Sequence, residues 1–244
     1  MAYGDKEYRE SRDKEIREWL ASKVETINSI PDNYLKALCY FSVLDCFAQE
    51  YSNYPTRDVT NAFCNFVLKF QRSYVFLNMV DPVTLFYHFE QELKKAGFDL
   101  SFMNNAGIYN PDLAIKSGYA DQMIKALKQL NINEIQINKH KYVNLLYSLR
   151  SKLSHEASPQ GGTMWSDHHL LENYPYYISC SRSFVLNDTI ERDEVWELTV
   201  PVGFIKKLSI ECIHNYLDFS LSNKSDPFEN DVFTRKSKLS WYDK

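Results

Sequence analysis

The chain has 244 residues, of which 44% are hydrophobic and 25% are charged, and its formal net charge is −4 at pH 7. A chain of this length can bury a sizeable core. The negative balance excludes a general electrostatic attraction for nucleic acid, so any RNA-binding surface must be a local patch. Only 7 glycines and 8 prolines accompany 17 tyrosines and 15 phenylalanines, which favours helices over a turn-rich β fold.

The five cysteines are widely spaced and form no C-x-x-C pair. This pattern favours reduced thiols in the core over disulfides or a zinc site. The segment from Met1 to Glu18 is charged, unlike a secretory signal. No apolar run approaches the roughly 18 residues that a membrane-spanning helix needs. We therefore expect a cytoplasmic protein that does not cross a membrane.

The first part of the chain repeats apolar residues at the three- and four-residue spacing of amphipathic helices. Pro31 and Pro82 mark helix starts, because proline is tolerated in a first helical turn, and Gly97 marks a stop. These signals predict helices over about residues 5–28, 32–51, 57–72 and 81–96, and a long loop over 98–117. The second helix is apolar over most of its circumference, which indicates a central position.

The second part of the chain changes from helical to strand-like periodicity. We expect a short helix over about 120–130 and another over about 139–154. Apolar and polar residues then alternate on both sides of Asn187-Asp188, which predicts a β-hairpin over about 174–200. A last helix is expected from Pro201 to about Ser220. The predicted fold is mostly α, with one domain over residues 1–221, an inserted hairpin, a closing helix and a polar tail over 222–244.

Two groups suited to phosphodiester chemistry, Arg150 and His155, lie at the end of the helix expected over 139–154. A guanidinium can hold developing negative charge, while an imidazole titrating near neutrality can move a proton. Five residues turn about 140° and rise about 7.5 Å along a regular helix, so the two side chains converge only if the helix ends or bends near His155. The segment 157–162 supplies such an ending. The alternative is a solvated helix end, where both residues suit the negative end of the helix dipole.

Neighbouring polar residues can support this pair. Ser151 lies four residues before His155, where its hydroxyl could orient the ring, and Tyr147 and Ser154 flank Arg150 on its own face. These positions make Ser151, Ser154 and Tyr147 candidate supporting residues.

Asp45 is a further candidate, because a carboxylate within an apolar run needs a partner or a polar cleft. One interpretation is that Asp45 pairs with Arg150 or with the backbone of the 139–154 helix. The alternative is a partly exposed acid at the edge of the apolar surface of its own helix. Lys139, Lys141 and Lys152 can flank an RNA phosphate path or form a solvated helix face. Asp167-His168-His169 with Glu172 favours a solvated loop over a metal site. We therefore expect no metal and no cofactor.

The segment from Tyr147 to Glu156 resembles the Arg-x(4–6)-His signature of the HEPN family, all-helical domains found widely in prokaryotic defence and toxin systems. Residues 37–45 also resemble the buried second helix of that family. The resemblance implies a HEPN-like helical bundle and a metal-independent endoribonuclease, a homodimer whose two motif helices face each other across a cleft. Arg150 would position and neutralise the scissile phosphate, and His155 would act as general acid or base. Ser151 departs from the family, which often has Asn there.

The function expected from this resemblance is that of an RNA-cleaving effector of antiphage defence, or of the toxin of a toxin–antitoxin pair. RNA is then the substrate, and an antitoxin or a defence-system protein is a partner. A homodimer also follows from the chemistry, since two-fold symmetry doubles a small set of catalytic groups. The alternatives are a catalytically inactive HEPN-like module that binds RNA, nucleotide or protein, and a structural helical protein in which the motif is a coincidence.

Overall fold

The computed structural model groups the chain into two compact units, Met1–Ser73 with Ile205–Lys244, and Tyr74–Phe204. The residues that it describes are 6–52, 58–103, 108–109, 111, 118–156, 174–186, 189–225 and 227. Within these ranges, only the backbone is described at residues 102, 108–109, 155–156, 180–186 and 189–194. The predicted mostly α fold with a hairpin and a closing helix is confirmed. The single domain over 1–221 stays a prediction.

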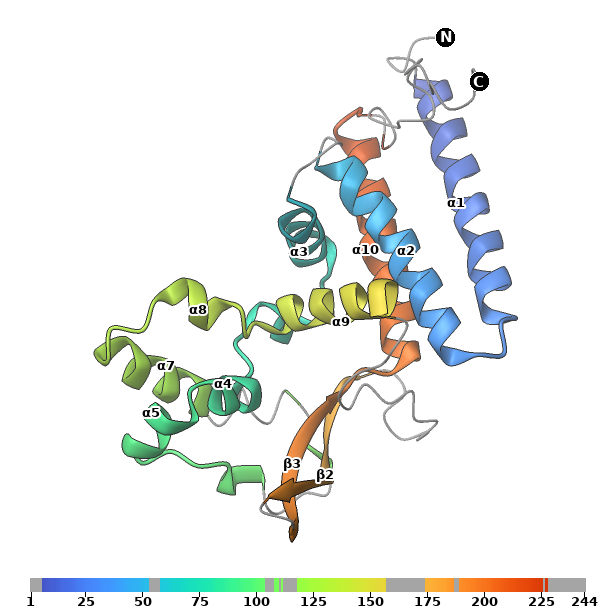
Figure 1. Ribbon diagram of the computed structural model, residues 1–244. Coiled ribbons are helices and arrows are strands. Elements are labelled where there is room, and N and C mark those ends of the chain that lie inside the picture. Colours follow the sequence, from blue (N-terminus) through green and yellow to red (C-terminus); the bar gives the residue numbers. More distant parts are fainter. Residues whose placement is uncertain are drawn as a thin grey trace, which may run out of the picture. The chain divides into compact units, whose positions relative to one another are not determined.

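The first unit is built from four helices of the described chain (Figure 1). They are α1 (Lys6–Asn28), α2 (Asn33–Tyr51), α3 (Val59–Phe70) and, from Ile205 onwards, α10 (Val202–Ser222). Side-chain caps fix two of the starts, because Asp32 accepts a hydrogen bond from the Leu35 amide at 2.8 Å and Asp58 accepts one from the Asn61 amide at 2.9 Å. The predicted helices are therefore confirmed, with α3 shorter than expected.

Aromatic rings fill the core of the first unit. Tyr216 on α10 meets Phe47, Tyr51, Phe66 and Phe70 at ring-centroid distances of 5.3 to 6.1 Å. These edge-to-face contacts are an arrangement that aromatic pairs prefer. The central position predicted for α2 agrees with its buried residues, which are Ala37, Tyr40, Phe41, Leu44, Phe47, Ala48 and Glu50.

Two details of the first unit differ from expectation. Leu35, one of the apolar residues of α2, is 46% exposed because it lies in the first turn of the helix. Cys46 is also exposed, whereas Cys64 and Cys212 are buried as predicted, and burial raises the pKa of the Cys64 thiol to about 12. Among the described residues, Cys39, Cys46, Cys64 and Cys212 are not joined by disulfide bonds.

The second unit carries short helices and a small sheet. Its elements are η1 (Val75–Asn78), α4 (Pro82–His88), α5 (Glu90–Lys95), η2 (Ser101–Met103), β1 (Ile108–Tyr109), α7 (Tyr119–Gln129), α8 (Glu134–Asn138), α9 (Tyr142–Glu156), β2 (Tyr176–Leu186) and β3 (Thr189–Thr199). The predicted helix over 81–96 is two helices, since Phe89 leaves helical geometry at φ −116° and ψ 38° and buries its ring. Gly97 ends α5 at φ +84°, as expected.

Three further differences concern segments without strong periodicity. The predicted loop over 98–117 contains η2 and β1, and α8 was not expected. Helix α9 begins at Tyr142 and ends at Glu156, later than the predicted 139–154 at both ends. Strands of two residues and helices of five carry too little sequence pattern to be recognised.

The predicted hairpin is confirmed, and it belongs to a three-stranded antiparallel sheet in the order β1-β2-β3. Tyr177 pairs with Leu198 and Ser179 with Trp196, and β1 adds Ile108 opposite Ile178. The turn at Asn187-Asp188 and most of the tail over 222–244 lie outside the described residues.

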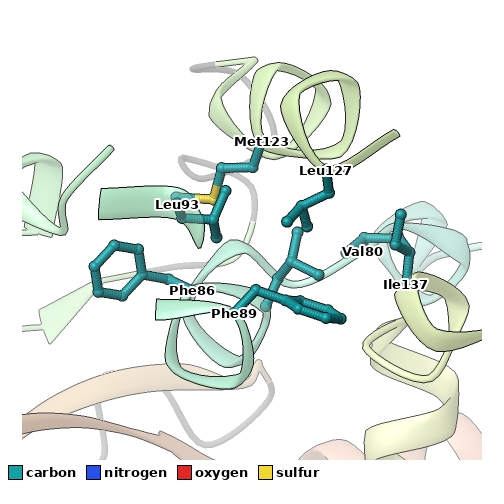
Figure 2. Packing of buried hydrophobic residues seen from close by; sticks show 8 residues of the cluster. Val80, Phe86, Phe89, Leu93, Met123, Leu127 and Ile137 are labelled. Carbon is teal, nitrogen blue, oxygen red and sulfur yellow. The ribbon is translucent and has the colours of Figure 1, made fainter. Parts of the chain in front are cut away.

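A separate apolar cluster forms where α4, α5, α7 and α8 meet (Figure 2). Its members are Val80, Leu85, Phe86, Phe89, Leu93, Met123, Leu127 and Ile137. Met123 and Leu127 lie one helical turn apart on α7, so both can face the same core. None of the helices in the described ranges combines the length and the apolar character needed to cross a membrane.

Candidate active site

Helix α9, which carries Arg150 and His155, is fixed at its N-terminal end by hydrogen bonds. The Tyr142 amide donates to the Met79 carbonyl at 3.0 Å, and Lys141 forms a β-bridge with Val80. Lys141 also donates from Nζ to Asn78 Oδ1 at 3.2 Å. The start of α9 is thus tied to the chain segment that follows η1.

A buried carboxylate strengthens this attachment. Asp81 is fully buried and accepts hydrogen bonds from the amides of Val83 at 3.2 Å and Thr84 at 2.9 Å, as the N-cap of α4. The Tyr142 hydroxyl donates to Asp81 Oδ1 at 3.1 Å, and the Tyr177 hydroxyl donates to the same oxygen. The two phenol oxygens are 3.0 Å apart. We call Asp81, Tyr142 and Tyr177 the carboxylate anchor, since it joins the starts of α4 and α9 to β2.

The titration of the carboxylate anchor follows from its burial. Burial raises the pKa of Asp81, and the donated hydrogen bonds oppose that shift. Burial and then the charge of Asp81 raise the pKa of Tyr177 well above its usual value, so the phenol keeps its proton and remains a donor. The sequence marked Asp81 only as a helix start, because its two tyrosine partners lie 61 and 96 residues further along the chain.

His140 lies beside the anchor, just before α9. Its carbonyl accepts a hydrogen bond from the Asp81 amide at 2.8 Å, and its Nδ1 is 3.2 Å from Thr84 Oγ1. Its ring centroid lies 4.9 Å from that of His88. Burial, followed by the charges of His88 and Lys139, lowers the pKa of His140 to about 4. His140 is therefore neutral near pH 7 and serves packing, not proton transfer at that pH.

The faces of α9 divide clearly between core and solvent. The apolar residues that recur every three or four positions, Val143, Leu146, Leu149 and Leu153, are buried. Ser148 and Lys152 are exposed, one helical turn apart on another face. Position 155 follows Lys152 by three residues, so its backbone lies on this same exposed face.

Arg150 is half-buried and lies two residues from both Ser148 and Lys152, so it points away from their face, on the side of Tyr147 and the exposed Ser154. Its guanidinium carbon is 5.8 Å from the ring centroid of Tyr147, one turn earlier on the helix. Helical side chains tilt towards the N-terminus, so an arginine at this position leans back over the turn that contains Tyr147. The Ser154 hydroxyl donates to the Arg150 carbonyl at 3.0 Å. Among the predicted supporting residues, Tyr147 thus contacts the side chain and Ser154 contacts the backbone.

The backbone of α9 stays helical through His155 to Glu156. The predicted helix end therefore comes after His155, and positions 150 and 155 of one chain lie about 140° apart and about 7.5 Å apart along the axis. Ser151, four residues before His155, is half-buried. The side chain of His155 and the segment 157–162 lie outside the described residues, so the approach of the imidazole to Arg150 stays a prediction.

The remaining predicted residues are more dispersed. Asp45 belongs to the first unit, on α2, where it is half-buried with Oδ1 shielded from solvent; its pairing with Arg150 stays a prediction. Lys139 and Lys152 are exposed, and Lys141 is half-buried. Lys141 lies just before α9, and Lys152 lies about 16 Å further along the helix axis. One RNA molecule could contact both lysines only if its backbone ran along the helix.

No cluster of three or more metal-ligand side chains occurs within the described ranges. The candidate segment from Asp167 to Glu172 lies outside them. A groove of about 450 Å³ between α5 and α7 contains none of the predicted site residues. It is lined by Glu92, Lys95, Ala96, Ala126, Gln129, Leu130 and Ile132.

Comparison with known proteins adds no relative: no family model, curated protein or solved structure matches this chain. Helix α9 is therefore the part of the chain that bears most directly on function.

Proposed function

We propose that this protein is a metal-independent endoribonuclease of the HEPN type that works as a homodimer. The observation that supports this most directly is the arrangement on α9. Arg150 is half-buried with its guanidinium beside the Tyr147 ring, and the exposed Ser154 follows it by one helical turn on the same side of α9. A cation held at the edge of an accessible helix face suits a phosphate ligand.

The proposed chemistry divides between two side chains. Arg150 stabilises the charge that develops on the phosphate oxygens as the phosphodiester is attacked. His155 transfers a proton, either from the attacking 2′-hydroxyl or to the leaving 5′-oxygen. The unperturbed pKa of histidine, near 6.5, suits both roles at neutral pH.

The separation of the two positions on one helix supports the proposed homodimer. Because α9 is continuous to Glu156, Arg150 and position 155 of a single chain lie on different faces. Two antiparallel α9 helices related by two-fold symmetry near Lys152 and Leu153 would bring position 155 of one protomer to the height of Arg150 in the other. Each phosphate then meets groups from both chains.

Mixing two inactive variants tests this arrangement. Arg150→Ala and His155→Ala should each abolish cleavage of a single-stranded RNA in EDTA. Co-refolded in equal amounts, they should regain about a quarter of the native activity, because half of the dimers are mixed and each carries one complete site of two. Cleavage that survives in both single variants would remove these residues from the mechanism. Activity that is lost singly and not regained on mixing would exclude a site shared between chains.

Binding without cleavage is the second candidate, and the continuity of α9 through position 155 favours it over a site formed by one chain. A HEPN-like module of this kind would hold the phosphate of RNA or nucleotide on Arg150. RNA that is retained by the native chain but stays intact after prolonged incubation would support this alternative.

Roles as a toxin or as a defence effector belong to the endoribonuclease proposal. They predict growth arrest on expression of the native chain but not of Arg150→Ala.

A further inference from the structure

The contact between Arg150 and Tyr147 suggests a second determinant of the proposed site. Arginine has a long side chain with many rotamers, and a guanidinium that samples all of them seldom faces a phosphate correctly. In this structure the guanidinium carbon lies 5.8 Å from the Tyr147 ring centroid, within the range of a cation–π interaction. Both side chains are half-buried.

The local sequence explains why this ring meets the arginine. Leu146 and Leu153, one turn before and after Arg150, are buried, so the core occupies that side of the helix. Ser154 is too short to reach the guanidinium and bonds to the Arg150 carbonyl instead. The tilt of helical side chains then directs the guanidinium towards position 147. A ring at position 147 therefore limits the rotamers that the Arg150 side chain can adopt.

We propose that Tyr147 is a positioning residue that holds the Arg150 guanidinium, through its aromatic face, in the orientation that receives an RNA phosphate. This inference rests on the proposed nuclease function for its catalytic consequence. The ring is the essential part, because the interaction uses the π-face and does not require the hydroxyl. Preorganisation of this kind raises the rate of the chemical step without a new contact to the substrate.

The test compares three variants of the full-length chain. Tyr147→Phe keeps the ring, Tyr147→Leu removes it while keeping a good helix former, and Tyr119→Leu is a matched control at a half-buried tyrosine of α7. With a single-stranded RNA oligonucleotide in EDTA, Tyr147→Leu should lower kcat about three- to tenfold and change KM little. Tyr147→Phe and Tyr119→Leu should retain the native kcat. The loss of kcat in Tyr147→Phe to the same extent as in Tyr147→Leu would overturn the proposal.

A second readout separates this inference from the nuclease function. The Nε–H resonance of Arg150, assigned by its disappearance in Arg150→Lys, reports the order of the side chain through ¹⁵N relaxation. It should be ordered in the native protein and in Tyr147→Phe, and mobile in Tyr147→Leu. An equally ordered resonance in Tyr147→Leu would overturn the positioning role whatever the activity. Loss of order in Tyr147→Leu, in a chain that cleaves no RNA, would support the positioning role while refuting the proposed nuclease.

Discussion

The carboxylate anchor permits a quantitative test of how α9 is held. Tyr177→Phe removes one donor to the buried Asp81 and leaves the ring in place. A hydrogen bond to a charged group contributes about 1.5–3 kcal/mol, so we expect the free energy of unfolding to fall by about that amount. Tyr142→Phe removes the donor at 3.1 Å and should cost about the same. Burial already raises the pKa of Asp81, so the carboxylate can take up a proton when a hydroxyl donor is removed. This uptake limits the loss of stability in both variants.

The double variant gives the sharper result. Both hydroxyls donate to Asp81 Oδ1, and their oxygens are 3.0 Å apart, so the two losses should not add. We expect a coupling energy of about 0.5–3 kcal/mol in urea unfolding followed by near-ultraviolet circular dichroism. Tyr51→Phe is the control, since its hydroxyl only accepts from Lys69 at an exposed site and should cost less than about 1 kcal/mol. Additive losses, or a Tyr177→Phe variant as stable as the control, would refute the anchor as a source of stability.

Two further predictions concern the same unit. The pKa of His140 is near 6.5 in the unfolded chain but about 4 in the folded protein. Between these pH values the unfolded chain binds a proton that the folded protein does not, so the free energy of unfolding decreases as the pH falls. The loss should reach about 3 kcal/mol by pH 4, and the pH dependence of urea unfolding should be weaker in His140→Gln; parallel profiles would contradict this. Gly97→Ala should cost about 1 kcal/mol through its φ of +84°, although a methyl group meets no neighbour there. An unchanged melting temperature in Gly97→Ala would contradict that conformational cost.

Periodicity predicted the long elements of this chain well. Helices α1, α2, α7 and α10 and the β2–β3 hairpin follow from apolar spacing, because each has enough residues to repeat its pattern. The break at Phe89 did not follow, since it depends on a ring that is buried beside His140 across a long sequence separation. Short elements such as α8 and β1 carry no usable repeat.

The candidate site was predictable only in part, for a similar reason. The buried face of α9 could be predicted from leucine and valine spacing, and Tyr147 lies beside Arg150 as helical geometry requires. The carboxylate anchor could not be predicted, because a hydroxyl donor at position 177 has no local relation to Asp81. The extension of α9 past His155 was also missed, since helix ends cannot be located to within one or two residues from apolar spacing.

The anchor also has a consequence during protein synthesis. Helix α9 leaves the ribosome before strand β2, because translation proceeds from the N-terminus and Tyr177 follows Tyr142 by 35 residues. A nascent chain that has not yet extended through β2 lacks the second hydroxyl that holds the base of α9. The helix bearing Arg150 therefore reaches its final attachment only after most of the second unit has been translated, which delays any activity of the growing polypeptide.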